Sequence, residues 1–325
     1  MSKGDRNIKK YFNILLTIIF LSLFAIYFFF NKEDLKTVLF IDWKYFLTIA
    51  IVTLGLFFIE GIFIKIILKA FDKNIDVNES VYLSTLSRIG NYLLPLRAGA
   101  AMRAAYLKKK FDFPYSQFLS TLSGYYIILF LLYSFLALIG LGVKYFINDE
   151  FYLVLTLFFF AVFVAMLILS LIKVPLEKIP DIKVRILDKV VKFVKKILEG
   201  WNIITNRKDI LFKLVLVTFG NIFLSTIISI IEFKALGINI GIANIVLYSC
   251  LAGVSLLISI TPGSLGLREA LFLLTSESLG LKNEYIMQMA LLDRGIMFGL
   301  LLILSIVIIF LSKKFNAQDI LKQRK

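Results

Sequence analysis

An apolar stretch of this chain is interrupted by proline, glycine and arginine in Tyr92-Leu-Leu-Pro95-Leu-Arg97-Ala-Gly99-Ala-Ala-Met-Arg103. A second is interrupted in the same way in Ser259-Ile-Thr261-Pro262-Gly263-Ser264-Leu-Gly266-Leu-Arg268-Glu269-Ala270. Broken helices are tolerated at membrane depth only where protein or a watery cavity surrounds them. A pair of broken segments, one in each half of a membrane protein, indicates a transport site.

The composition is that of a membrane protein. The 325 residues are 59% hydrophobic and 18% charged. A helix needs roughly 20 apolar residues to cross a bilayer. We predict an all-α fold, a polytopic helical membrane protein in which residues 1–325 form one transmembrane domain. The six predicted full spans are 11–30, 44–68, 116–142, 151–172, 210–235 and 289–312.

The chain has one cysteine, Cys250, and no histidine. This excludes a disulfide within the chain, the usual zinc sites and histidine-dependent catalysis. Cys250 lies in an apolar run, where a cysteine is typically a small packing residue. We therefore predict no metal site and no cofactor.

The formal net charge of +15 is explained by the positive-inside rule. The excess of lysine and arginine lies at the N-terminus, at 103–110, across 173–208 and at 313–325. No module that interleaves aromatic and basic residues accompanies it, so we expect no nucleic-acid partner. The charges predict a multi-pass protein of the cell membrane with its N- and C-termini in the cytoplasm.

The number of membrane crossings between loops of assigned side predicts how the two interrupted segments enter the membrane; we call this the parity argument. Because 210–235 ends outside and 289–312 must begin outside, the segment 242–281 enters and leaves on the outer side. By the same logic, 80–107 enters and leaves on the cytoplasmic side. We expect six full spans plus two re-entrant segments (about eight spans if both hairpins cross), arranged as inverted repeats. The alternative is that 80–107 is a cytoplasmic amphipathic loop and 242–261 a simple span.

The segment 174–208 is predicted to be amphipathic and cytoplasmic. Within it, 182–199 has apolar residues at helical spacing and lysines on the other face. Such a helix lies in the head-group plane and favours anionic lipid. An equally weighted alternative is a connector whose lysines simply reach water.

Charged residues inside apolar runs are the candidates for function, because a charge at the centre of a spanning helix costs about 2.5–3.5 kcal/mol on insertion scales. Glu232, near the outer end of its span, is one of them. The planar guanidinium of arginine presents paired N–H donors that match the oxygens of a phosphate. We therefore predict that the two breaks bind a lipid phosphate in a cavity at the membrane midplane. Ser264 is expected to cap a half-helix whose positive end faces this cavity. The predicted substrate-binding residues are Arg88, Asn91, Arg97, Arg103, Ser264, Arg268 and Arg294.

Ion pairing is the competing interpretation. Pairing of Arg268 or Arg294 with an acidic side chain would fix helix packing without any ligand. Glu269 and Asp293 are expected to pair in this way, and Glu60 is also a candidate for proton coupling. Structural or coupling roles are predicted for Glu60, Glu269, Asp293, Pro95, Gly99, Pro262, Gly263 and Gly266.

These residues resemble the lysylphosphatidylglycerol synthase transmembrane-region family. The first motif is Ser87-Arg-Ile-Gly90-Asn91-Tyr-Leu-Leu-Pro95, with Gly99 and Arg103 after it. The more specific second motif, P-G-x-x-G-x-x-E-A, covers 262–270, and Arg294 follows at the family's spacing. The resemblance covers essentially the whole chain. It implies a helical domain with re-entrant segments that moves lipid between leaflets, as in the flippase half of multiple peptide resistance factors.

The chain departs from the family pattern at two places. Ala100 stands where an acidic residue is common, and Ser123-Gly124-Tyr125-Tyr126 stands where many members have a Glu-Arg pair. The first site is therefore poorer in charge than usual. The chain ends at Lys325, soon after the last span, so we expect a stand-alone member without the synthase domain, and lipid aminoacylation is not carried over.

We therefore expect a lipid flippase or transporter that binds an anionic phospholipid or a polyisoprenoid-phosphate lipid. The first alternative is a non-catalytic membrane partner of a lipid-using glycosyltransferase or another envelope-biosynthesis enzyme. The second is a membrane-embedded lipid-modifying enzyme, with Glu60, Glu269 and Asp293 as its only bases. The absence of histidine or cysteine from both motifs disfavours it.

Overall fold

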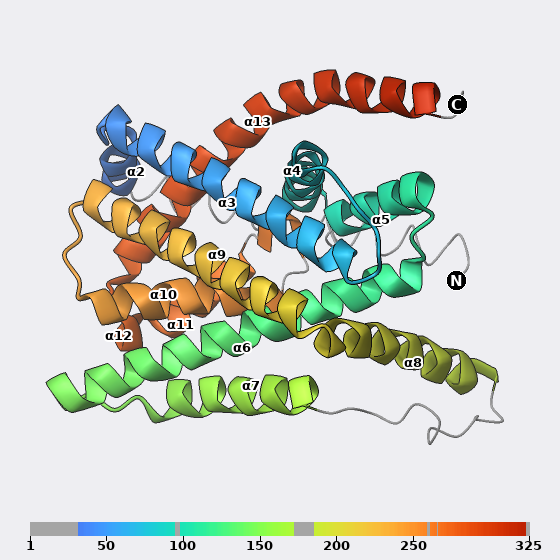
Figure 1. The fold of residues 1–325 in the computed structure, drawn as a ribbon. Coiled ribbons are helices and arrows are strands. Elements are labelled where there is room, and N and C mark those ends of the chain that lie inside the picture. Colours follow the sequence, from blue (N-terminus) through green and yellow to red (C-terminus); the bar gives the residue numbers. More distant parts are fainter. Residues whose placement is uncertain (1–31, 95–97, 172–184, 259–260, 265, 323–325) are drawn as a thin grey trace.

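The computed structural model describes residues 32–94, 98–171, 185–258, 261–264 and 266–322. Within these ranges the chain is helical and contains no strand (Figure 1). Five described helices are long and apolar enough to cross a membrane. They are α3 (Trp43–Lys69), α6 (Tyr115–Asn148), α7 (Leu153–Leu171), α9 (Lys208–Ala235) and α13 (Asn283–Lys322). Five of the predicted spans are thus confirmed, and the run 11–30 lies outside the described residues.

Shorter helices complete the described part of the chain. The two interrupted segments form α4 (Val77–Leu93) with α5 (Ala98–Phe111), and α10 (Ile242–Val254) with two short 3-10 turns and α11 (Leu267–Leu274). The 3-10 turns are η2 (Ser255–Ile258) and η3 (Pro262–Ser264), and the other helices are α2 (Lys32–Leu39), α8 (Arg185–Asn206) and α12 (Ser276–Leu279). Residues 80–107 are therefore packed helices rather than a surface loop. α10 runs on into η2, and together they form an apolar helix over Ile242–Leu257 that is shorter than the five candidate spans.

The long helices pack around an antiparallel pair, α3 and α9, which lie side by side (Figure 1). Small residues allow this close approach: Gly55 faces Leu224, and Gly220 faces Ile59. α6 crosses this pair and also contacts α7, α8 and α10. Most α7 side chains point out of the bundle, with Val154 83% exposed, as expected of a helix that faces lipid.

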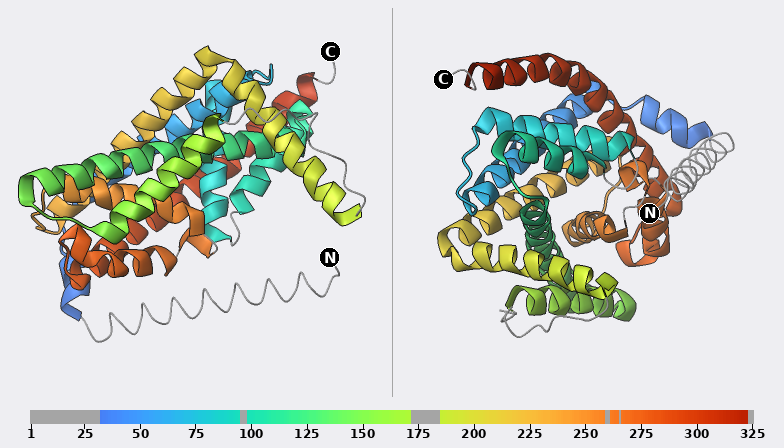
Figure 2. Two further views of the ribbon diagram at one scale, coloured as in Figure 1. Left: turned by 90° about the horizontal axis from the view of Figure 1, so that it is seen from below. Right: turned by 90° about the vertical axis from the view of Figure 1, so that its right-hand side faces the viewer.

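The directions of the helices agree with the parity argument (Figure 1). α3, α7 and α13 run from left to right, and α6 and α9 return from right to left. α4 and α5 follow the right-hand end of α3, whereas α10 to α12 follow the left-hand end of α9, so the two interrupted segments enter from opposite ends (Figures 1 and 2). Each half thus has the order long helix, broken segment, long helix. A repeat relationship between the halves stays a prediction.

The described part of the predicted amphipathic segment is helical. Its last residues are packed in protein, because Trp201 and Ile204 are buried and Trp201 faces Gly124 at the start of α6. α8 and α6 approach closely at Gly200, because a Cβ at this position would overlap Ser120. Most side chains of 182–199 lie outside the described residues, so their contact with lipid stays a prediction.

Candidate functional site

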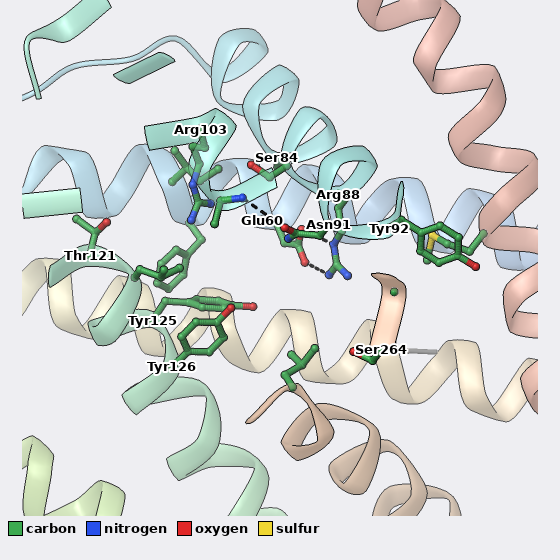
Figure 3. A pocket seen from close by; sticks show the side chains of 18 of the residues that line it. Glu60, Ser84, Arg88, Asn91, Tyr92, Arg103, Thr121, Tyr125, Tyr126 and Ser264 are labelled. Carbon is green, nitrogen blue, oxygen red and sulfur yellow. Dashed lines mark hydrogen bonds and ion pairs between the residues drawn. The ribbon is translucent and has the colours of Figure 1, made fainter. Parts of the chain in front are cut away.

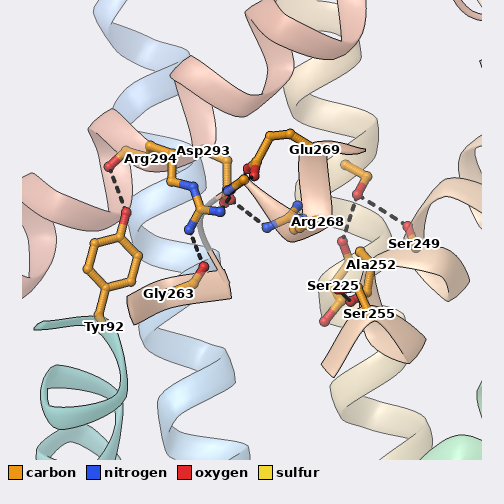
Figure 4. Close-up of polar contacts among 12 residues, drawn as sticks. Tyr92, Ser225, Ser249, Ala252, Ser255, Gly263, Arg268, Glu269, Asp293 and Arg294 are labelled. Carbon is orange, nitrogen blue, oxygen red and sulfur yellow. Dashed lines mark hydrogen bonds and ion pairs between the residues drawn. The ribbon is translucent and has the colours of Figure 1, made fainter. Parts of the chain in front are cut away.

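The two interrupted segments meet inside the bundle. Tyr92, near the end of α4, packs on Gly263 in η3, where an added Cβ would lie 3.2 Å from the tyrosine ring. The Tyr92 hydroxyl donates to the backbone carbonyl of Arg294 at 3.3 Å, which joins α13 to this contact (Figure 4). Residues from both breaks and from the last long helix therefore form one cluster.

A cavity of about 230 Å³ lies beside this cluster (Figure 3). α3 to α6, α10 and α13 contribute to its wall. It lies level with the interior of the long helices, because Glu60 is well inside α3 and Arg294 is near the middle of the apolar part of α13. The predicted residues that line it are Glu60, Arg88, Asn91, Arg103, Gly263, Ser264, Arg268, Asp293 and Arg294. Their role toward a ligand stays a prediction.

The first break is held by backbone contacts. The side-chain oxygen of Asn91 accepts a hydrogen bond from the backbone N–H of Ala100 at 3.3 Å, so the end of α4 caps the start of α5. Gly99 lies so close to α4 that a Cβ would overlap the Ser87 carbonyl oxygen. Asn91 and Gly99 therefore have structural roles here. Pro95 and Arg97 lie outside the described residues.

The second break uses positive φ angles. Gly263 has φ +56° and Gly266 has φ +81°, conformations in which glycine carries no steric penalty. The expectation that Ser264 caps the half-helix is wrong, because α11 begins at Leu267 with Gly266 as its N-cap. The Glu269 carboxylate supplies the missing acceptor and takes a hydrogen bond from the Gly266 N–H at 2.7 Å. Of Pro262, only the backbone position at the start of η3 is described.

Three of the cavity arginines pair with carboxylates. Arg88 pairs with Glu60, with an Nε to Oε2 distance of 2.9 Å. The Arg268 Nη1 atom lies 2.7 Å from Asp293 Oδ2 (Figure 4). The Arg294 Nη2 atom lies 2.7 Å from Glu269 Oε1, and Arg294 also donates a hydrogen bond to the Gly263 carbonyl oxygen. The ion pair between Glu269 and Arg294 therefore links the second break to α13. The structure contains the pairing expected of Glu269 and Asp293, whereas the partner of Glu60 is Arg88, which the sequence did not indicate.

Arg103 differs from these three arginines. It makes no hydrogen bond or ion pair with any described residue, and its guanidinium lies 5.2 Å from the centre of the Phe118 ring. Four arginines and two carboxylates line the cavity, and Glu269 neutralises Arg294 from behind it. Among the described residues, this leaves one net positive charge. Arg103 is the arginine without an ion pair, and it interacts only electrostatically with Glu60, the partner of Arg88.

The wall also contains hydroxyl groups that the motif analysis did not select. Ser84, Thr121, Tyr125 and Tyr126 line the cavity near Arg103 (Figure 3). In the sequence, Tyr125 and Tyr126 are notable only as a departure from an expected Glu-Arg pair, and that departure is the signal that could have identified them. The first site is richer in hydroxyl groups than in charge.

The fold and this site define a polytopic helical membrane protein with a charged internal cavity between two broken segments. The chain belongs to the family described as the lysylphosphatidylglycerol synthase TM region, whose model matches residues 14–305. Membership relates the protein to lipid handling. No curated protein and no solved structure matches the chain.

Proposed function

We propose that this protein binds the phosphate of an anionic lipid in the cavity and moves the lipid between the leaflets of the cell membrane. The observation that carries the proposal is Arg103, a cation on the wall of an internal cavity that forms no ion pair with any carboxylate in the described part of the chain. An intramembrane charge without a partner is costly, and a lipid phosphate would supply the missing counter-ion.

The charge balance favours a head group with a net negative charge. The three paired arginines already have counter-ions, so a ligand needs to neutralise only Arg103. A head group with a net positive charge, such as a lysylated lipid, would meet like charge here. The Tyr125 hydroxyl can donate a hydrogen bond to a phosphate oxygen. The hydroxyls of Ser84 and Thr121 already donate to backbone carbonyls, so they can accept hydrogen bonds from a polyol head group.

The cavity continues to the cytoplasmic end of the bundle in the predicted topology. Leu68, Leu107 and Phe118 line it there, beside the basic residues Lys69 and 108–110. In this arrangement a lipid would enter from the inner leaflet. Rocking of the two halves around the contact between Tyr92 and Gly263 would then expose Arg103 to the other side.

Lipid exchange in liposomes tests the proposal. Purified protein is reconstituted with fluorescent phosphatidylglycerol, and an impermeant quencher reports the fraction exposed outside. Arg103→Gln should slow exchange and weaken binding roughly 10- to 100-fold, because it removes a charge-assisted contact of about 1.5–3 kcal/mol. Arg103→Lys should retain part of the activity, since it keeps the charge but loses the fork.

The matched control is Lys213→Gln, because Lys213 lies near Asp209 on the exposed face of α9 and is not among the residues that line the cavity. Parallel liposomes carry phosphatidylethanolamine, lysyl-phosphatidylglycerol or a polyisoprenyl phosphate, which separates phospholipid from polyisoprenoid ligands. Equal exchange by wild type and Arg103→Gln, or faster exchange of the lysylated lipid than of phosphatidylglycerol, would overturn the proposal.

A further inference from the structure

A carboxyl group that the proposed transport site does not use is buried behind it. Glu232, in the last turns of α9, is 2% exposed. Its Oε1 atom is fully buried and has no hydrogen-bond partner among the described residues. Removing a carboxylate from water without a partner is costly, and such groups usually become neutral.

The surroundings of Glu232 contain too little positive charge to stabilise a second anion. Asp293 from α13 and Arg268 from α11 are the charged groups that interact with it, and Tyr248 from α10 is also near. Arg268 already bonds Asp293 at 2.7 Å. In the described parts of α3 and α6, no charged group interacts with Glu232. Two carboxyl groups therefore share one arginine.

The neighbouring cavity arginine, Arg294, is not available to form an ion pair with Glu232. Arg294 is bound to Glu269 and to the Gly263 carbonyl oxygen (Figure 4). Lys234, two residues after Glu232, is exposed on the outside of α9. Aromatic rings pack against one another around Tyr248, which stacks on Phe272 with ring centres 4.2 Å apart and packs against Phe233, the residue after Glu232. Glu232 itself is 2% exposed, so little water reaches its carboxyl group.

We propose that Glu232 is a proton-binding site, occupied in this conformation and placed behind the Arg268–Asp293 ion pair. The proton makes the side chain neutral, which removes the need for a second buried cation. Asp293 and Arg268 act on Glu232 through their charge, and both also line the cavity, where the Arg268 side chain is 21% exposed. The ion pair thus connects Glu232 to the cavity.

This position connects the proton to an anionic ligand, a step that rests on the proposed function. A lipid phosphate held by Arg103 can also bond Arg268, which lines the same cavity, and it then competes with Asp293 for that arginine. Asp293 would lose its counter-ion beside the protonated Glu232, and Asp293 would take up a further proton. Binding of the anion and binding of a proton should therefore favour each other, by reciprocal linkage. A proton gradient would supply the energy for transport.

Infrared spectroscopy tests the proton site without any lipid substrate. Wild-type protein in nanodiscs at neutral pH should show the C=O stretching band of a protonated carboxyl group, and Glu232→Gln should lack it. Glu232→Asp should shift the band rather than remove it, which keeps the test valid if the glutamine variant fails to fold. Glu199→Gln, an exposed acid on α8, is the control and should leave the band unchanged. A spectrum that does not change between wild type and Glu232→Gln would overturn the proposal.

Binding of short-chain phosphatidylglycerol, measured over a range of pH, tests the linkage. The affinity of the wild type should rise as the pH falls, by up to about tenfold per pH unit for one coupled proton. Asp293→Asn, which removes the acceptor of the further proton, should bind with a flatter pH dependence. Absence of any binding would count against the proposed function but not against the infrared result, whereas binding with the same pH dependence in both proteins would overturn the linkage.

Discussion

Gly99 shows how a single residue holds the first break together. An alanine Cβ at this position would overlap the Ser87 carbonyl oxygen and also approach the backbone N of Asn91. Because these are backbone atoms, the clash is relieved only by moving α5 away from α4. We expect Gly99→Ala to lower stability by at least about 1–3 kcal/mol, the usual cost of overpacking. Thermal unfolding of the purified protein in detergent measures this as a lower melting temperature.

Gly142 provides the matched control. It lies within α6, and an added Cβ would meet nothing within 4 Å. Gly142→Ala should therefore be neutral or stabilise the helix by roughly 0.5–1 kcal/mol. If Gly99→Ala melts at the same temperature as Gly142→Ala, the close packing of α4 on α5 is not a determinant of stability.

The sequence predicted which residues surround the cavity better than it predicted what each one does. Arginines inside apolar runs are conspicuous because their burial is costly, and Arg88, Arg103, Arg268 and Arg294 all line the cavity. Their partners depend on how the helices pack, which no spacing rule gives. The pair of Glu60 with Arg88 therefore could not be inferred, nor could the isolation of Arg103.

At the scale of an element, the loop between α6 and α7 is fixed by a buried lysine. Lys144 is 3% exposed, bonds the Ser278 carbonyl oxygen at 3.0 Å, and lies 3.0 Å from the Glu150 carboxylate. Hydrogen bonding to Lys144, and secondarily to Tyr152, lowers the pKa of Glu150 below its ordinary value. The interaction links the end of α6 to α12.

This lowered pKa gives a signed pH dependence of stability. A depressed folded-state pKa adds stability above the unfolded-state pKa, and the stability is lost as the pH falls through the folded-state value. The melting temperature of wild type should exceed that of Glu150→Gln at neutral pH, by a few degrees at most because Glu150 is exposed. The gap should close as the pH falls below about 4. Glu199→Gln should show no such closing gap, and a gap that widened in acid would contradict the assignment.

The long helices were predictable because length and apolarity alone define a span. The breaks were only partly predictable. Proline and glycine located both of them, but the sequence preference for serine as a cap pointed to Ser264, whereas the backbone places Gly266 at the cap with φ +81°. The acceptor comes instead from Glu269, three residues later. Ser264 also has a positive φ, +57°, so the backbone angle alone does not decide between the two residues. The path of the chain does, because α11 begins at Leu267, three residues after Ser264.

At the scale of the whole molecule, the opposed entry of the two broken segments follows from the directions of the long helices. α4 and α5 start and finish at one end of the bundle, and α10 to α12 at the other (Figure 1). The parity of the spans and the placement of lysine and arginine were sufficient to predict this arrangement. The residues through which the segments meet could not be predicted, because the contact between Tyr92 and Gly263 depends on how the helices pack.

Cysteine labelling tests the predicted topology in cells. Lys109→Cys lies near the end of α5, and Asn239→Cys lies in the loop before α10, and both positions are exposed. In intact spheroplasts, an impermeant maleimide should label Asn239→Cys only, because the loop before α10 faces outward. After permeabilisation it should label both, because basic residues hold the end of α5 in the cytoplasm. The natural Cys250 is buried, so the unsubstituted protein is the control and should stay unlabelled. Labelling of both variants in intact spheroplasts would place the two broken segments on the same side, and alternating exposure of Arg103 by opposed halves would then have no structural basis.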